Sequence, residues 1–226
     1  MSHNPLDEAL IHKTFIIAEQ ARAAVSPDPI VGALVVRNNK IIGQGVHIER
    51  HAPHAEMLAI ERAGAGAKGA TLYISLEPCG HSGKHPPCVD GIIAAGIRRV
   101  VYSAQDTNPL VRQEGGLDRL RSAGVEVVAG VLEKEGRAFN EGFLKHVVSG
   151  SPFVTAKWSM TLDGKIATRT RQSQWITGSD ALRFAHRLRR KVDAILVGIG
   201  TVMQDNPHLT VRLDSLIAGR APSAYQ

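Results

Sequence analysis

Three residues with metal-binding side chains, His54, Cys79 and Cys88, constrain this sequence more than any other feature. An imidazole and two thiolates together suit zinc. Because the three lie in separate segments, a fold in which they share one ion must bring those segments to one point. Three protein ligands also leave the fourth tetrahedral position to water, which is typical of a catalytic site. Glu56 is not needed as a ligand, so it is a candidate proton carrier.

Two plainer interpretations of these residues stay open. The histidine and the thiols could be ordinary core residues. The ion could also be structural, with His51, His81 or His85 as a fourth ligand. The start of the chain has no basic segment followed by an apolar one, so a signal peptide is not expected. In a protein that stays inside the cell, two cysteines favour a metal or catalytic role over a disulfide.

The first two thirds of the chain alternate between strand-like and helix-like patterns, which predicts a layered α/β domain over residues 1–148. Prolines at 27 and 29 should end the first helix. The expected elements are helices over 7–24, 54–63, 88–95, 117–123 and 133–148, and strands over 30–36, 41–48, 70–75, 98–103 and 125–128.

Residues 149–152, Ser-Gly-Ser-Pro, are the expected linker to a second domain over 153–226. A β-rich run begins at Phe153, and a basic helix is expected over 179–190. Residues 194–197 read as a buried strand, followed by a turn at 198–201 that leads into a further helix.

Composition narrows the classes of partner. No run of residues approaches the length of a membrane span, so we expect a cytoplasmic protein with no membrane contact. The net charge of +6 favours an anionic partner, either a phosphorylated small molecule or a nucleic acid. Aromatic residues make up only 4% of the chain and offer few stacking platforms, so nucleic acid is not expected. A homo-oligomer stays open.

The histidine–glutamate pair followed by a proline–cysteine pair matches the general pattern of zinc deaminases, although eight residues separate the cysteines here instead of two. The longer spacing is similar to one family, the bifunctional riboflavin-biosynthesis deaminase–reductases. The segments that resemble its deaminase half are Pro29–Ala33, His54–Glu56, Leu76–Cys79 and Pro86–Cys88, and those that resemble the start of its reductase half are Ser159–Lys165, Trp175–Thr177, Thr201–Pro207 and Leu209–Arg212.

The resemblance implies a cytidine-deaminase-like three-layer α/β/α domain, followed by the start of a dihydrofolate-reductase-like α/β domain. It implies zinc-dependent deamination of 2,5-diamino-6-(5-phosphoribosylamino)pyrimidin-4-one to 5-amino-6-(5-phosphoribosylamino)uracil, then NADPH-dependent reduction of the ribosyl group. Glu56 would move protons. The implied contacts are Asp28, His47, Lys84, Ser173, Arg189, Leu209 and Arg212 for substrate, and Ser159, Trp175, Thr201 and Asp205 for NADPH.

Two departures from the family pattern stand out. Asp28 occupies a position where the family usually has asparagine, so a hydrogen-bond donor is lost. Only about 75 residues follow the linker, whereas a complete reductase domain needs roughly 200. We therefore expect deamination without reduction.

Rival interpretations remain. One is a zinc deaminase of free nucleotides or of tRNA; the other is a basic zinc-dependent nucleic-acid-binding module. Lys84 could also be a solvated loop cation, and Asp28 and His47 could merely cap turns or strand ends.

Overall fold

The computed structural model describes residues 4–83, 85–109, 111, 115–173 and 176–213. The chain divides into two compact units, residues 1–153 and 154–226. The expected linker, 149–152, lies at the end of the first unit, and its role as a domain boundary stays a prediction.

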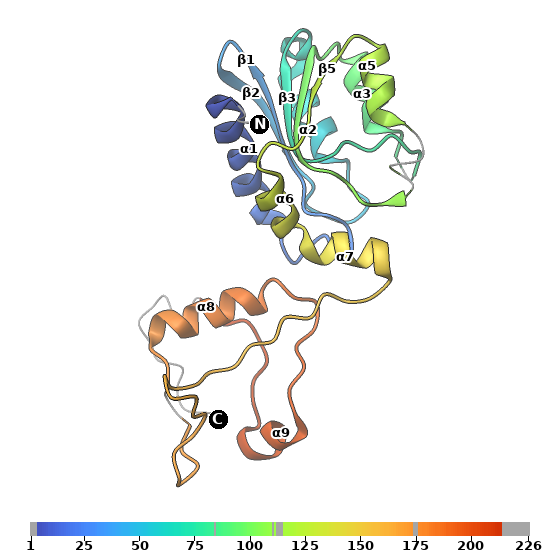
Figure 1. Ribbon diagram of the computed structural model, residues 1–226. Helices are drawn as coiled ribbons and strands as arrows, with labels where there is room; N and C mark the ends of the chain where they lie inside the picture. Colours follow the sequence, from blue (N-terminus) through green and yellow to red (C-terminus); the bar gives the residue numbers. More distant parts are fainter. Residues whose placement is uncertain (1–3, 84, 110, 112–114, 174–175, 214–226) are drawn as a thin grey trace. The chain divides into compact units, whose positions relative to one another are not determined.

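A five-stranded sheet forms the centre of the first unit (Figure 1), with strand order β2-β1-β3-β4-β5. β1 is antiparallel to both of its neighbours, whereas β3, β4 and β5 run parallel. The β1–β2 hairpin turns at Asn38 and Asn39, with φ of 51° and 59°. Asparagine tolerates this left-handed geometry, which tight hairpins need. The strands are β1 Gly32–Arg37, β2 Lys40–Val46, β3 Thr71–Leu76, β4 Arg99–Ala104 and β5 Glu126–Val128.

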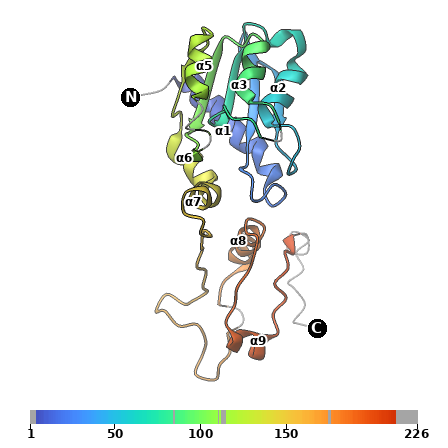
Figure 2. The ribbon, with the colours of Figure 1, turned by 90° about the vertical axis from the view of Figure 1, so that its right-hand side faces the viewer.

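Helices cover both faces of this sheet, which confirms the three-layer α/β/α arrangement (Figures 1 and 2). Leu72 and Ile74 of β3 pack in the core beneath α2, α3 and α5, and Tyr73 packs in the core beneath α1. This alternation follows from the two-residue period of a strand. The helices of the unit are α1 Pro5–Ala18, α2 Ala55–Ala63, α3 Cys88–Ala94, α5 Gly116–Ser122, α6 Glu133–Phe139 and α7 Glu141–Ser149, with short 3-10 turns at Glu19–Ala21 and Gly64–Ala67.

α2 lies directly against the backbone of β2. A Cβ atom at Gly45 would stand 2.0 Å from the carbonyl oxygen of Ala55, and one at Gly43 would stand 2.1 Å from that of Ala59. Such contacts are far below van der Waals distance, so only glycine permits this approach. The two glycines therefore set the depth at which the first turn of α2 sits on the sheet.

Two helix predictions for this unit need correction. The single helix expected over 133–148 is interrupted at Asn140, whose φ of −113° and ψ of 25° are not helical. Its side-chain amide bonds instead to the main chain of Ile30. The first helix ends at Ala18, and the 3-10 turn that follows leads to Ala23, whose positive φ of 74° stops any continuation toward residue 24.

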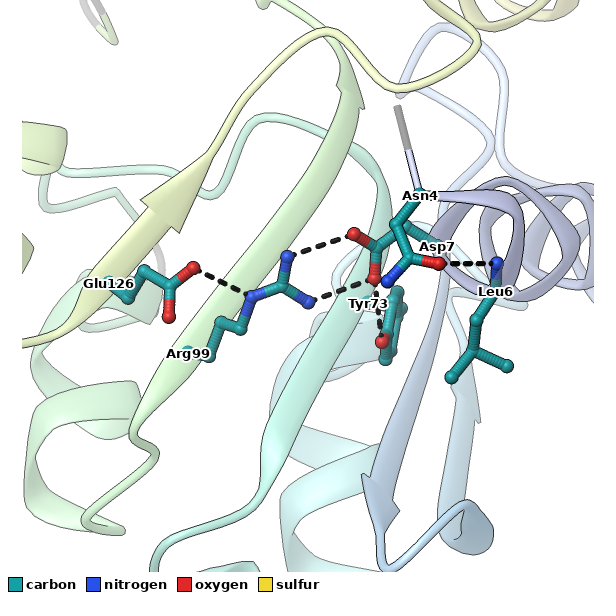
Figure 3. A network of polar contacts seen from close by, with 6 residues as sticks. All are labelled: Asn4, Leu6, Asp7, Tyr73, Arg99 and Glu126. Carbon is teal, nitrogen blue, oxygen red and sulfur yellow. Dashed lines mark hydrogen bonds and ion pairs between the residues drawn. The ribbon is translucent and has the colours of Figure 1, made fainter. Parts of the chain in front are cut away.

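A polar network anchors the start of α1 to the sheet (Figure 3). The carboxylate of Asp7 is buried, with only 3% exposure. It accepts hydrogen bonds from the Tyr73 hydroxyl and from the guanidinium of Arg99, which also donates to Glu126. These contacts satisfy a buried charge that would otherwise destabilise the fold.

The second unit contains two helices in its described residues, α8 Ser179–Arg189 and α9 Ile199–Asp205 (Figure 2). The buried strand expected over 194–197 is wrong, and the β-rich run that begins at Phe153 forms no strand in the described residues 154–173 and 176–213. Leu196 is 97% exposed, not buried. β-rich composition favours extended backbone, but a strand exists only where a neighbour completes its hydrogen bonds.

Over the part of the chain that the structure describes, no helix is long and apolar enough to cross a membrane.

Candidate metal and active site

The three candidate metal ligands come together in the first unit. Their ligand atoms all lie within 4.8 Å of one another. His54 stands at the N-cap of α2, and its side chain does not cap the helix, so the ring is free to bind elsewhere. Cys88 is the first residue of α3, and Cys79 lies in the loop after β3. Two ligands therefore come from successive helix starts, as the sequence predicts.

The distances between these atoms suit a zinc ion. His54 Nδ1 lies 3.1 Å from Cys88 Sγ and 3.5 Å from Cys79 Sγ. Bond lengths of about 2.0 Å to nitrogen and about 2.3 Å to sulfur place tetrahedral ligands roughly 3.5 Å apart. The backbone N–H of Cys88 donates to Cys79 Sγ at 3.4 Å, which supports a thiolate there. The donor set and its spacing thus fit zinc.

Electrostatics also favour a deprotonated sulfur. The hydrogen bond from the Cys88 thiol, together with that from His54, lowers the pKa of Cys79 to about 4 against the opposing effect of burial. The pKa of Cys88 is raised because its thiol shares a proton with the neighbouring Cys79 sulfur. The hydrogen bond to Cys79 raises the pKa of His54 to about 9, although burial opposes the rise. One thiolate is therefore ready to bind a cation.

Glu56 is positioned as a proton carrier. It lies in the first turn of α2, and only 4% of it is exposed. Burial, followed by the negative charge of Cys79, raises its pKa to about 7. A cation held beside it opposes this rise. A buried carboxyl with a pKa near neutrality can both accept and release a proton at working pH.

Two predicted substrate residues lie beside the ligands. His47 is buried, and its ring stacks edge-on against that of His54 with centroids 5.7 Å apart. Its Nε2 is 3.7 Å from a carboxylate oxygen of the half-buried Asp28. His47 Nδ1 lies 3.4 Å from the carbonyl oxygen of Pro53. The structure thus brings Asp28 and His47 to the same site as Glu56 and the ligands.

The three histidines considered as a fourth ligand do not join the cluster. Among the described residues, the metal-binding group consists of His54 and the two cysteines alone. Nε2 of His85 instead lies 2.9 Å from the main-chain oxygen of His51, and its ring lies edge-on to His54. His81 Nδ1 is buried without a hydrogen-bond partner. This arrangement favours the open, catalytic type of site over a closed structural one.

In the second unit the structure brings two predicted phosphate contacts together. Arg189 and Arg212 both donate to the carbonyl oxygens of His208 and Thr210. The backbone N–H of Arg212 also donates to Nδ1 of the buried His186 at 3.1 Å. Both arginines are half-buried, as is Leu209, whereas Ser173 is exposed.

The predicted cofactor residues are more scattered along this unit. The hydroxyl of Ser159 donates to that of Thr177 at 3.4 Å. Thr201 and Asp205 are exposed on α9, where the Thr201 N–H donates to the carbonyl oxygen of Gly198. Lys84 and Trp175, which were predicted to contact substrate and NADPH respectively, lie outside the described residues.

Sequence reasoning missed Asn140. Its amide accepts from the Ile30 N–H at 2.8 Å and donates to the Ile30 carbonyl oxygen at 3.0 Å. Ile30 is two residues after Asp28, so this pair of bonds lies close to the site. The available signal was an asparagine inside a helical pattern, where it is a weak helix former.

Two family models match the chain. Residues 5–104 match the cytidine and deoxycytidylate deaminase zinc-binding region, which contains the candidate ligands and Glu56. Residues 152–223 match the RibD C-terminal domain. The two matches fall in the two halves that the sequence motifs indicate.

Similar proteins span most of this chain. It is 47% identical to the riboflavin biosynthesis protein RibD of Aquifex aeolicus over 207 residues, which is 92% of this chain and 58% of that protein. It is 43% identical to RibD of Escherichia coli over 210 residues, 93% of this chain and 57% of the relative. The chain therefore spans somewhat over half the length of these curated relatives.

Solved structures agree with the sequence comparison. A diaminohydroxyphosphoribosylaminopyrimidine deaminase/5-amino-6-(5-phosphoribosylamino)uracil reductase from Thermotoga maritima superimposes with a TM-score of 0.86 at 44% identity, over 92% of this chain and 60% of that one. RibD from Acinetobacter baumannii superimposes with a TM-score of 0.80 at 37% identity, over 92% and 58% of the two chains. With the zinc-binding region and the start of the RibD C-terminal domain in the expected order, the chain belongs to the RibD family of riboflavin biosynthesis proteins.

Proposed function

We propose that the first unit catalyses hydrolytic deamination of 2,5-diamino-6-(5-phosphoribosylamino)pyrimidin-4-one to 5-amino-6-(5-phosphoribosylamino)uracil. The observation that carries this proposal is the buried carboxyl of Glu56 beside an open set of three zinc ligands. The relatives' role in riboflavin biosynthesis supports the choice of substrate.

Each residue of the site has a distinct task. His54, Cys79 and Cys88 would hold a zinc ion, which supplies the Lewis acidity that makes water nucleophilic near neutral pH. Glu56 takes the proton from the attacking water and then delivers a proton to the departing amine. The same carboxyl must act first as base and then as acid, and burial of Glu56 supports this role because it disfavours the charged form.

Asp28 and His47 would orient the pyrimidine ring. They lie together beside His54, where an imidazole N–H and a carboxylate can pair with the donors and acceptors of a ring edge. Lys84 would contact the substrate phosphate. A charge pair with phosphate fits a chain whose net charge is +6.

The second unit would belong to an NADPH-dependent reductase domain that acts on the deaminated product. Residues 152–223 match the RibD C-terminal domain. Arg189 and Arg212, with Ser173 and Leu209, would bind the ribosyl phosphate, and Ser159, Trp175, Thr201 and Asp205 would contact NADPH. The expected compartment is the cytoplasm, because two free cysteines that serve as metal ligands suit reducing surroundings.

The test is an assay of turnover with the phosphoribosyl diaminopyrimidinone as substrate. Turnover is measured both as ammonia release and as the absorbance of the product. Glu56→Gln keeps the size of the side chain but removes proton transfer, so we expect bound zinc to persist while turnover falls by about 10²–10⁴-fold. Cytidine, dCMP and a tRNA serve as competing substrates in the same assay. Turnover of one of these in place of the diaminopyrimidinone, or near-normal rates in the variant, would contradict the proposal.

A further inference from the structure

The segment that carries Asp28 is held by bonds from several parts of the first unit. The N–H of Asp28 donates to the carbonyl oxygen of Val25 at 2.8 Å, and that of Gly32 donates to the buried hydroxyl of Ser75 at 3.0 Å. The N–H of His47 donates to the carbonyl oxygen of Val31 at 3.1 Å. Between these contacts, both polar groups of Ile30 bond to the side chain of Asn140.

The Asn140 side chain makes two hydrogen bonds to the main chain of Ile30, and this pair of bonds is called the clamp. An amide side chain carries an acceptor and a donor side by side, so it can satisfy the N–H and the C=O of one residue together. Asn140 is 3% exposed, and a buried bond of this kind loses little to competition from water. The two residues are 110 positions apart in the sequence, so the clamp joins the α6–α7 junction to the site.

The local backbone reflects this contact. Asn140 leaves helical geometry, and α6 ends at Phe139 while α7 begins at Glu141. The bonds from Asn140 N–H to the Gly136 oxygen and from Leu144 N–H to the Asn140 oxygen are kept at 3.2 Å and 2.9 Å. The interruption therefore turns the side chain toward Ile30 at little loss of main-chain bonding.

We propose that Asn140 is a positioning residue for the deamination site. It acts through Ile30 to hold Asp28 at its place beside His47, 3.7 Å from Nε2, and it does not itself touch the substrate or the zinc ligands. This inference rests on the proposed function for its kinetic consequence, but the clamp itself is a physical contact that can be measured without any substrate.

Asn140→Leu tests the clamp, because leucine keeps the approximate volume but neither donates nor accepts. We expect the KM for the phosphoribosyl diaminopyrimidinone to rise about tenfold while kcat changes less than about threefold and zinc content is unchanged. The matched control is Ser103→Ala. Ser103 is also fully buried and bonds α6 to the sheet through the Leu132 carbonyl oxygen, but it has no bond to residues 28–31. The control should keep the wild-type KM.

Hydrogen exchange provides the readout that is independent of activity. The Ile30 amide should lose protection about tenfold or more in Asn140→Leu and keep it in Ser103→Ala, with the Ile74 amide of β3 reporting that the fold is intact. A wild-type KM in Asn140→Leu, undiminished Ile30 protection, or equal effects in the control would each overturn the proposal. Should the wild-type protein release no ammonia, the proposed function fails, while exchange at Ile30 still decides whether the clamp exists.

Asn140→Asp covers the case in which the leucine variant does not fold. Its carboxylate still accepts from the Ile30 N–H but cannot donate to the Ile30 carbonyl oxygen and repels it. We expect protection at the Ile30 amide to persist while KM rises about threefold or more. An unchanged KM in this variant would overturn the positioning role.

Discussion

The guanidinium of Arg99 donates two parallel hydrogen bonds to the carboxylate of Asp7, each 2.8 Å long (Figure 3). The Asp7 side chain is 4% exposed and that of Arg99 19% exposed. This bidentate geometry is typical of strong charge-assisted hydrogen bonds between arginine and a carboxylate. It docks the first turn of α1 onto β4, on the face of the sheet opposite α2.

Removal of the Arg99 side chain should therefore destabilise the first unit. Arg99→Ala leaves the Asp7 carboxylate buried without its cation, and we expect the free energy of unfolding to fall by about 3 kcal/mol. Arg121→Ala is the control, because the Arg121–Asp118 pair is exposed and should change the same quantity by less than about 0.5 kcal/mol. Urea unfolding of both variants measures the change in unfolding free energy. Equal losses of unfolding free energy in the two variants would contradict the prediction.

Alkaline pH should weaken the fold through its tyrosines. Burial raises the pKa of Tyr73 to about 12, with the hydrogen bond to Asp7 as a further cause, and burial raises that of Tyr102 to about 12. The unfolded value is about 10. A raised pKa means that the protonated hydroxyls stabilise the fold fully below about pH 10, and that this contribution is lost as pH rises through about 12.

Absorbance at the tyrosinate band, with urea unfolding at several alkaline pH values, measures this effect. Tyr73→Phe should flatten the alkaline fall in stability, because it removes one of the two ionisations. Ionisation of both buried tyrosines near the ordinary value of about 10 would show that the prediction is wrong.

Zinc content should depend on Cys88. Serine replaces the thiolate with a poor zinc ligand, so Cys88→Ser should purify with strongly reduced zinc, below about 0.2 ion per chain. His85→Ala provides the control, since His85 lies near His54 but outside the ligand group, and it should retain about one ion. Metal analysis of the two proteins gives the answer; full zinc in the serine variant would remove Cys88 from the site.

Gly45 should be intolerant of any side chain. The methyl group of Gly45→Ala would meet the Ala55 carbonyl oxygen at 2.0 Å, so α2 must move outward and carry His54 and Glu56 with it. We expect a loss of about 2 kcal/mol in unfolding free energy and weaker zinc binding. Gly200→Ala is the control, because a Cβ there meets no atom within 4 Å and lies inside α9. It should be neutral or slightly stabilising.

The 226-residue chain should deaminate without oxidising NADPH. Cofactors in open α/β sheets bind at the carboxyl ends of strands, but residues 154–173 and 176–213 contain no strand. Thr201 and Asp205 are exposed on α9. With the deaminated product supplied, NADPH absorbance should stay constant, while the Thermotoga maritima deaminase/reductase serves as positive control. Steady oxidation by this chain would contradict the expectation.

The site was easier to predict from sequence than the rest of the fold. Zinc accepts few side-chain types, so His54, Cys79 and Cys88 stand out from their neighbours, and the structure brings them together. The pairing of the strands expected over 30–36 and 41–48 has a similarly local cause, because Asn38 and Asn39 between them tolerate the positive φ of a tight turn. In both cases the cause is the chemistry of the residue types themselves, which can be seen directly in the sequence.

The features that the sequence did not predict depend on residues far away in the chain or on neighbouring segments. Nothing near Asn140 shows that its amide bonds to Ile30, because that partner lies 110 residues away. The run 194–197 has the composition of a strand, but pairing depends on a neighbour that the segment does not itself specify. Asp28 and His47 came from the family resemblance, and their contact with each other follows only from the fold.

The Asn140–Ile30 contact also sets an order of events during synthesis on the ribosome. The three candidate metal ligands all lie within residues 54–88, whereas the amide that bonds to Ile30 lies at residue 140. The side chain that holds the segment around Asp28 is therefore synthesised after all three candidate ligands. If Asn140 positions Asp28 as proposed, metal binding and substrate recognition would therefore depend on parts of the chain that are synthesised at different times.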